Sequence, residues 1–367
     1  MSVTLRRARR GRVSVLAAAL TVLALSVSAC SSGTSTTPAG ETVQIDVGTD
    51  TPVSAATPLR VAVALPGTNN SYLQAQIEQV KSDIAKIPGA EVTIFDGKFD
   101  PTTQFNSLQT IIESGKYNAI LLPSLDSNLN CKVATEQAPA KNIVVVAMTT
   151  ALCGRTVNEG EELWAPGTLS YVGGLDTVDY WTDYLEYVIA KNPGPQKVVV
   201  LKGPDNIGIT INLDAAIEKV TAEHPEFEIV AQANTDYSIP QGNEKATDML
   251  QAHPDASIIF SAYVTLTQGA VQAVQAAGRT GDIKIYDKGS SKYSIEQLEA
   301  GTIEASAPEY PRTTISSALQ QVVDAFDGKA PVRFLKNSGA PLPADAEEGT
   351  GFFVITKDTA SSFTPES

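Results

Sequence analysis

Residues 60–72 read RVAVALPGTNNSY, and the prediction of the fold starts from this stretch. The run from Arg60 to Leu65 is apolar and rich in β-branched residues, which predicts a strand buried on both faces. A short polar loop follows. The amphipathic pattern from Tyr72 to Ile87 then predicts a helix, which Pro88-Gly89 ends. A buried strand, a polar loop and a helix form the repeating unit of a parallel α/β sheet.

The same alternation continues along the chain. In the first half it predicts strands at 60–65, 91–95, 119–122 and 143–147 and helices at 72–87, 102–114 and 127–140. In the second half it predicts strands at 197–201, 227–231, 257–260 and 283–286 and helices at 213–222, 244–251, 266–277 and 295–300. Two such series imply two doubly wound α/β lobes with parallel sheets. Ligands of such sheets bind beyond the carboxyl ends of the strands.

The first thirty residues predict export. Five arginines within residues 6–12 precede an apolar run at 13–27, and this order is typical of a secretory signal that is short for a membrane span. The sequence VSAC at 27–30 resembles the lipobox of bacterial lipoproteins. That resemblance implies that residues 1–29 are removed and that Cys30 carries diacylglycerol. An ordinary signal peptide with a chance cysteine and a twin-arginine signal are the alternatives.

The segment after the cysteine predicts a flexible tether. Residues 31–57 are rich in Ser, Thr, Pro, Ala and Gly, so they are expected to stay disordered. With lipidated Cys30 they make residues 30–58 a tether with an end-to-end distance of about 30 Å. Each buried lipid methylene contributes roughly 0.8 kcal/mol to anchoring. We therefore expect a folded body held at the outer face of the bacterial cytoplasmic membrane.

Charge excludes one class of partner. The chain holds 27 Lys and Arg against 41 Asp and Glu, and five of the basic residues lie in the signal. The remainder carries a net charge of −19, which argues against nucleic acid because its binding depends on phosphate neutralisation. About 310 residues follow the tether, enough for two domains with their own cores.

Motifs of catalysis are missing from the sequence. His224 and His253 each precede a proline, where a loop role is favoured. No GxSxG, HExxH, CxxC or GxxxxGK pattern occurs. The sequence therefore predicts no enzyme, no cofactor and no metal site.

Four short motifs point to a family: LPGTNNSY at 65–72, LLPSLDS at 121–127, IYD at 285–287 and APEYP at 307–311. In this order and spacing they resemble the type I periplasmic binding proteins, in particular the ribose-binding-like branch. The resemblance covers about residues 59–328. It implies two lobes that close on a small-molecule solute, and a closed form that docks on an ABC permease with a separate ATPase. It also implies a monomer.

The resemblance implies where the lobes exchange chain. Three crossovers would join them, near Gly173-Gly174, near Ala307-Pro308 and after Gly328. The implied parts are an N-terminal lobe of residues 59–173 and 308–330, a C-terminal lobe of 174–307 and 331–357, and a tail of 358–367.

Cys131 and Cys153 remain once Cys30 is set aside. In an exported protein an even pair favours a disulfide, and both residues follow neighbouring strands of the first lobe. Closing that loop of about 22 residues would stabilise the fold by roughly 3 kcal/mol on the chain-entropy model. Two buried free thiols are the alternative.

The candidate site follows from the resemblance and from the strand ends. The candidate ligand-binding residues are Asn69, Asn70, Tyr72, Thr149, Thr150, Trp181, Tyr263, Asp287 and Glu309. Two of these assignments have structural alternatives. Asn69-Asn70 could be a turn and a helix cap, and Trp181 could belong to the core.

Departures from the family pattern indicate the kind of solute. Ribose-like binders have Asp-Arg at the position of Thr149-Thr150 in this chain. They have an arginine at the position of Ile209 or Ile211, and Asn-Asp at the position of Tyr263-Val264. A cleft without arginine but with carboxylates disfavours an anionic ligand, because buried like charges cost several kcal/mol. A neutral hydroxylated solute, such as a sugar or polyol, and a cationic amine held by acids and aromatic faces both remain open. A less polar solute is a further alternative.

Two functions also remain open. The chain could be the solute receptor of an ABC importer, or a receptor that presents its ligand-bound form to a membrane histidine kinase. Both use the same shift of population toward a closed state, so the sequence does not separate them.

Overall fold

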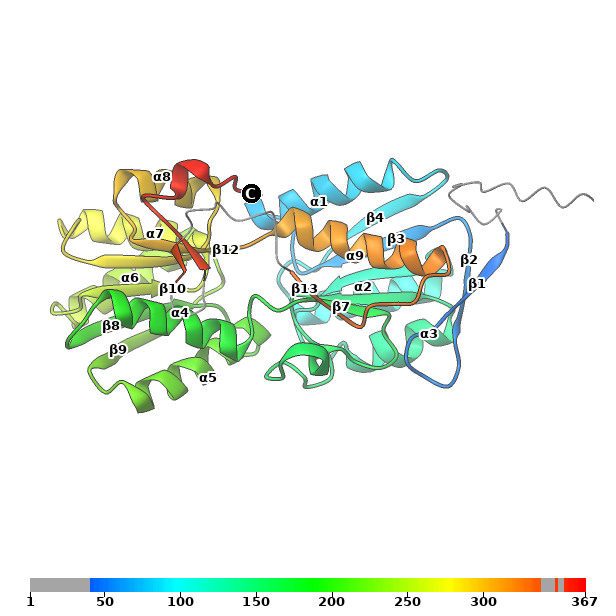
Figure 1. Ribbon diagram of the computed structural model, residues 1–367, viewed down its shortest axis with the longest axis horizontal. Helices are drawn as coiled ribbons and strands as arrows, with labels where there is room; N and C mark the ends of the chain where they lie inside the picture. Colours follow the sequence, from blue (N-terminus) through cyan, green and yellow to red (C-terminus); the bar gives the residue numbers. More distant parts are fainter. Residues whose placement is uncertain (1–39, 338–346, 349–352) are drawn as a thin grey trace, which may run out of the picture. The chain divides into compact units, whose positions relative to one another are not determined.

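The computed structural model describes residues 40–337, 347–348 and 353–367 (Figure 1). The signal and Cys30 lie outside these residues. The described residues form a two-stranded hairpin and two sheets, one of six strands and one of seven. Helices cover both faces of each large sheet, so the predicted fold class of two α/β lobes is confirmed.

The N-terminal lobe is built on the six-stranded sheet, whose strands are all parallel. Their order is β13 (Phe334–Lys336), β7 (Ser170–Gly173), β6 (Val144–Met148), β5 (Ala119–Pro123), β3 (Arg60–Leu65) and β4 (Glu91–Asp96). Alternate residues of β3 face opposite helix layers. One layer holds α1 (Ser71–Ile84) and α9 (Pro311–Phe326), and the other holds α2 (Pro101–Ser114) and the π-helix Val133–Gln137 continued by α3 (Ala138–Ala140).

The C-terminal lobe is built on the seven-stranded sheet. Its order is β14 (Glu347–Glu348), β15 (Phe353–Thr356), β12 (Ala305–Pro308), β11 (Lys284–Gly289), β10 (Ile258–Ser261), β8 (Gln196–Lys202) and β9 (Phe227–Asn234). Strands β14 and β15 run antiparallel at one edge. One face packs on α4 (Val178–Lys191) and α5 (Gly208–Glu223), and the other on α6 (Ile239–Ala252), α7 (Val264–Ala276) and α8 (Lys292–Ala300).

The chain changes sheet at three places. It leaves β7 for α4 after Gly173, leaves β12 for α9 after Pro308, and leaves β13 for β14 after Lys336. The assignment of residues 331–357 to the C-terminal lobe is therefore wrong for Phe334–Lys336, which pair with β7. The strand has three residues, and so short a run does not reveal which sheet edge it joins.

The prediction that residues 30–58 form a flexible tether is also wrong for the second half of this segment. Strands β1 (Thr42–Ile45) and β2 (Val53–Ala56) form an antiparallel hairpin. Ile45, Val47 and Val53 are buried in the core that α1 and α9 share. Val43, Ile45 and Val47 alternate with polar residues, and this period of two was the overlooked signal of a half-buried strand.

Two further contacts complete the fold. Cys131 and Cys153 form the predicted disulfide, with their Cα atoms 4.8 Å apart. The predicted tail, residues 358–367, packs on both lobes. Phe363 is buried in the core of the C-terminal lobe, and the Glu366 carboxylate accepts a hydrogen bond from the backbone N–H of Thr313 (3.0 Å), in the first turn of α9. Among the residues described, no helix has the length and apolar character needed to cross a membrane.

Candidate functional site

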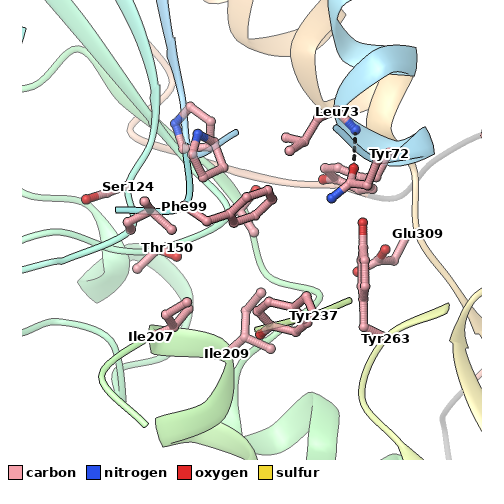
Figure 2. Close-up of a pocket in the computed structure, with 15 residues that line it drawn as sticks. Tyr72, Leu73, Phe99, Ser124, Thr150, Ile207, Ile209, Tyr237, Tyr263 and Glu309 are labelled. Atoms are coloured by element: carbon pink, nitrogen blue, oxygen red, sulfur yellow. Dashed lines mark hydrogen bonds between the residues drawn. The ribbon is translucent and has the colours of Figure 1, made fainter. Parts of the chain in front are cut away.

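A cavity of about 90 Å³ lies where the loops after the parallel strands of both sheets meet (Figure 2). Its N-terminal-lobe wall follows β3, β4, β5 and β6 and consists of Pro66, Asn70, Tyr72, Leu73, Phe99, Pro123, Ser124, Leu125, Thr149 and Thr150. Its C-terminal-lobe wall follows β8, β9 and β10 and, with the second crossover, consists of Ile207, Ile209, Tyr237, Tyr263 and Glu309. The carboxyl ends of parallel strands are where ligands of such sheets bind.

Each lobe contributes an aromatic ring in the same way. Phe99 comes three residues after β4, with φ of 54°, and Tyr237 comes three residues after β9, with φ of 62°. Each ring lies against a glycine. A Cβ added at Gly67 would be 2.2 Å from the Phe99 ring, and one added at Gly203 would be 2.1 Å from the Tyr237 ring. These two glycines are needed because any larger residue would displace a ring that lines the cavity.

The polar side chains of the cavity are largely committed to the protein. The Asn70 side-chain oxygen accepts the backbone N–H of Leu73 (2.9 Å) and so caps α1. The Ser124 hydroxyl donates to the carbonyl of Asp126 and accepts from Asn130, both at 2.9 Å. Tyr72 and Thr149 both line the cavity, and the Thr149 side chain acts to lower the pKa of the Tyr72 phenol. The side chains of Asn70 and Ser124 therefore hold the loops in place.

A buried ion triad lies behind Glu309. Lys288, at the end of β11, is 1% exposed, and its Nζ lies 2.7 Å from Oδ1 of Asp176 and also contacts Glu309. Asp176 and Glu309 belong to the first and second crossovers. Burial acts to lower the pKa of Lys288, but the carboxylates of Asp176 and Glu309 outweigh this effect and raise the pKa. The lysine is thus a fixed positive charge that joins the C-terminal lobe to both crossovers.

Burial sets the protonation of the cavity's acid and phenol groups. It raises the pKa of Glu309, while the Lys288 charge opposes that rise. It also raises the pKa of Tyr72 and of Tyr263, so both phenols stay neutral at physiological pH and can donate hydrogen bonds. Glu309 reaches the cavity already paired with a cation.

The structure brings six of the predicted site residues to the cavity: Asn70, Tyr72, Thr149, Thr150, Tyr263 and Glu309. Asn69, which was expected beside Asn70, is exposed and does not line it. The helix-cap alternative applies to Asn70, which lines the cavity and caps α1 at the same time.

Two predicted residues lie in the core instead. Trp181 is fully buried against Phe260, with ring centroids 6.0 Å apart, and the Lys288 ammonium lies 5.3 Å from its ring centre. Asp287 is fully buried too. Its carboxylate accepts hydrogen bonds from the hydroxyls of Thr267 and Ser306, the latter at 2.6 Å. Neither residue lines the cavity, because both side chains point into the lobe that carries them.

Other residues of the site were missed. Phe99 and Tyr237 follow strands that the periodicity had predicted, so the rule of strand carboxyl ends could have found them. Lys288 and Asp176 had no such signal. A single lysine at the end of an apolar strand reads as a surface residue, and its pairing depends on two crossovers distant in the chain.

A family model described as the periplasmic binding protein domain matches residues 61–330. This match spans most of the chain. The chain belongs to the periplasmic binding protein family. Its relatives place it in the type I, sugar-binding branch of ABC transporter solute-binding proteins. The family consists of binding proteins of transporters.

Individual relatives of this periplasmic binding protein are distant. It is similar to the ribose import binding protein of Bacillus subtilis, with 20% identity over 78% of this chain and 87% of that protein. It is 23% identical to the xylitol-binding protein of Mycolicibacterium smegmatis over 61% of this chain and 63% of that protein. The solved Caulobacter myo-inositol binding protein shares the fold, with a TM-score of 0.69, 18% identity and coverage of 83% and 95%.

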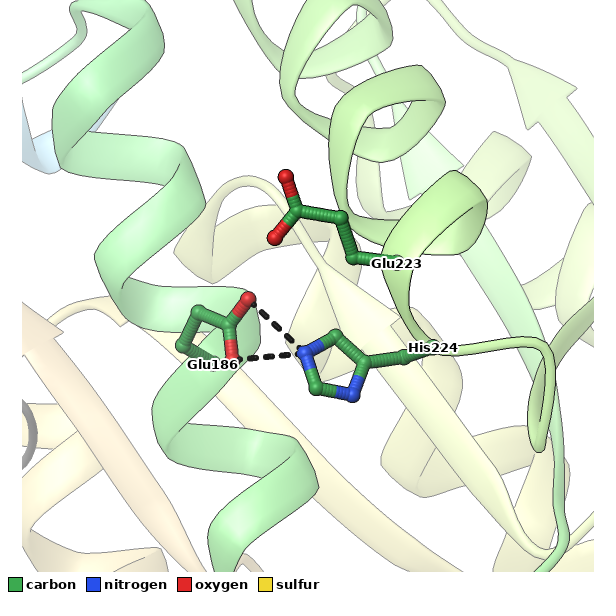
Figure 3. A group of neighbouring side chains, drawn as sticks. All are labelled: Glu186, Glu223 and His224. Atoms are coloured by element: carbon green, nitrogen blue, oxygen red, sulfur yellow. Dashed lines mark hydrogen bonds and ion pairs between the residues drawn. The ribbon is translucent and has the colours of Figure 1, made fainter.

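A group of possible metal ligands lies away from the cavity of this binding protein. Glu186 on α4 and Glu223 and His224 at the end of α5 bring one ligand atom each within 4.8 Å of the others (Figure 3). The His224 Nε2 lies 3.1 Å from Glu186, and its Nδ1 lies 3.3 Å from Glu226. Both ring nitrogens therefore already have carboxylate partners, and the group forms a partly exposed ion pair between α4 and α5.

Proposed function

We propose that this protein is the solute-binding lipoprotein of an ABC importer and that it captures a small neutral hydroxylated solute between its two lobes. The observation that carries the proposal is the cavity walled by strand-end loops of both lobes. A solute in this position contacts both lobes at once. It therefore favours the closed state by its differential affinity, and the closed state is what a permease would recognise.

The charges around the cavity support a neutral solute over a cationic one. The amine hypothesis depended on free carboxylates, but Asp287 lies outside the cavity and Glu309 is paired with Lys288. The described residues that line the cavity include no Arg, Lys or Asp side chain. An uncharged ligand enters such a site without leaving a second charge to be desolvated.

The proposal includes anchoring at the outer face of the cytoplasmic membrane through Cys30. The supporting evidence is the lipobox-like VSAC at 27–30 after a basic and apolar leader. A Cys30→Ser variant expressed in a bacterial host should appear unlipidated in the medium, while the parent chain stays with the membrane fraction. Equal retention of both would contradict the anchor.

A matched pair of variants tests the binding site. Asn70→Asp keeps an oxygen to cap α1 but replaces the amide that can donate to a solute, whereas Asn69→Asp makes the same change on the exposed neighbour. Titration calorimetry with D-ribose, xylitol, myo-inositol and small cyclic diols should identify a binder. We expect Asn70→Asp to weaken its affinity at least tenfold and Asn69→Asp to change it less than twofold. Equal effects would show that the cavity is not the binding site.

A further inference from the structure

The cavity also indicates which class of neutral solute it takes. Resting on the proposed function, we infer that the solute is a small molecule built on a flat, weakly polar ring with one to three hydrogen-bonding groups, rather than a fully hydroxylated sugar. The inference depends on three features of the lining: few free polar groups, apolar side chains at the start of α5, and aromatic rings from both lobes.

Free hydrogen-bonding groups are scarce in the cavity. Ser124 already donates and accepts hydrogen bonds within the protein, and one oxygen of Glu309 is paired with Lys288. The Tyr237 hydroxyl is buried, so it offers little surface to a solute. Among the described side chains of the lining, the Asn70 amide nitrogen, the hydroxyls of Tyr72, Thr150 and Tyr263, and the second oxygen of Glu309 remain for a solute. These groups make up a small part of the cavity surface, most of which is carbon.

A lining that is mainly carbon does not satisfy the hydroxyls of a sugar. A pentose or an inositol carries a hydroxyl on nearly every ring carbon, and each needs a partner once water is expelled. A buried hydroxyl without a partner costs the full free energy of its desolvation. A ring with one to three polar substituents fits the groups that are available.

The start of α5 makes the rest of the wall apolar. Ile207 precedes the helix and Ile209 lies in its first turn, and both side chains line the cavity. Gly208 lies between them, and an added Cβ there would be 2.9 Å from methyl groups of Thr150 and Thr156 in the other lobe. The helix therefore approaches the N-terminal lobe closely and presents branched aliphatic carbon to the solute.

The aromatic rings define the shape of the solute. Figure 2 shows Phe99 and Tyr237 on either side of the open space, with Tyr263 beside it. Tyr237 and Tyr263 contact each other edge to face, with centroids 5.3 Å apart, which holds both rings in place. Rings that approach from two lobes favour a flat solute that stacks between them.

The test compares two classes of probe on the full chain in detergent. Isothermal titration measures the dissociation constants of 4-hydroxybenzyl alcohol and 1-phenylethane-1,2-diol, and those of D-ribose and myo-inositol. We expect at least one ring alcohol to bind tenfold or more tightly than either polyol. D-ribose or myo-inositol binding as tightly as the ring alcohols would overturn the inference and leave the proposed function standing. No binding by either class would count against both.

A matched pair of variants then tests the apolar wall. Ile209→Ser places a hydroxyl in the lining, and Ile211→Ser makes the same change two residues later on α5, at a side chain that is 38% exposed and outside the cavity. Affinity for the tightest ring alcohol should fall about tenfold in Ile209→Ser, as expected for losing aliphatic contact in a specificity pocket. It should stay within twofold in Ile211→Ser. An unchanged or increased affinity in Ile209→Ser would overturn the inference.

Discussion

The two lobes build their walls of the cavity on one plan but with different chemistry. In each lobe an aromatic residue comes three residues after a strand, and its ring lies against a glycine. This residue is Phe99 in the N-terminal lobe and Tyr237 in the C-terminal lobe. The N-terminal lobe adds Asn70 and Thr150, whereas the C-terminal lobe adds Ile207 and Ile209. Directional hydrogen bonds therefore come mainly from one lobe, and apolar burial from the other. The N-terminal lobe is suited to orienting a solute and the C-terminal lobe to covering it.

The largest expected effect concerns the lysine that joins the C-terminal lobe to the crossovers. Lys288→Met keeps the side-chain bulk but leaves Asp176 and Glu309 buried without their cation. Breaking a buried ion pair in this way costs about 3–5 kcal/mol. Denaturant unfolding should show this loss. Lys197→Met is the control, because that lysine pairs with Asp255 on the surface and should contribute less than about 1 kcal/mol. Equal losses would mean that the triad does not stabilise the junction.

The next prediction tests the shared plan of the lobes. Gly67→Ala and Gly203→Ala each put a methyl group into an aromatic ring, and overpacking of this kind costs about 1–3 kcal/mol. Both should lower the free energy of unfolding by similar amounts and alter the near-ultraviolet circular dichroism. Truncating the ring as well, in Gly67→Ala/Phe99→Ala, should remove the clash. A clear loss of unfolding free energy in only one of the two variants would show that the two rings are held differently.

A smaller effect is expected where the tail bridges the lobes. The Glu366 carboxylate accepts the Thr313 N–H at the start of α9, and the Glu366 carbonyl accepts from Nε of Arg312 (2.9 Å). Glu366→Gln removes the charge at this helix N-terminus and should lower the free energy of unfolding by about 1 kcal/mol. Glu299→Gln, on the exposed surface of α8, is the control and should be nearly neutral. Thermal unfolding of both variants measures the difference.

The smallest effect concerns the surface ion pair of the C-terminal lobe. Partial burial acts to lower the pKa of His224, but Glu226 and Glu186 outweigh it and raise the pKa above its usual 6.5. The folded state favours the protonated form of His224. The ion pair therefore stabilises the fold fully below pH 6.5, and this stabilisation is lost as the pH rises through the pKa of the folded state. The gain is about 0.2–1 kcal/mol, as for other exposed pairs. Glu186→Gln should reduce the difference in melting temperature between pH 5.5 and pH 8, and an unchanged difference would contradict the pairing.

Individual residues show how far a sequence predicts the site. Asn70, Tyr72 and Thr150 lie within a few residues of the carboxyl ends of buried parallel strands, so their place at the cavity was predictable. Asp287 was expected at the end of such a strand, but it lies inside β11 and its side chain turns to Thr267 and Ser306 in the core. Successive side chains along a strand point to opposite faces of the sheet, and the sequence does not show which of them meets the cavity.

The amino-acid sequence alone determined the two α/β lobes, the family and the disulfide. These depend on local periodicity, on motif order and on the parity of cysteines in an exported protein. Only the tertiary structure decided where the hairpin at residues 42–56 packs, the ion triad of Lys288 and the hydrogen bonds that polar groups of the cavity already make. Each of these depends on contacts between residues distant along the chain, whose free energy exists only after both lobes have packed. The physical character of the cavity therefore comes from what its side chains already bind, and their identity alone does not reveal it.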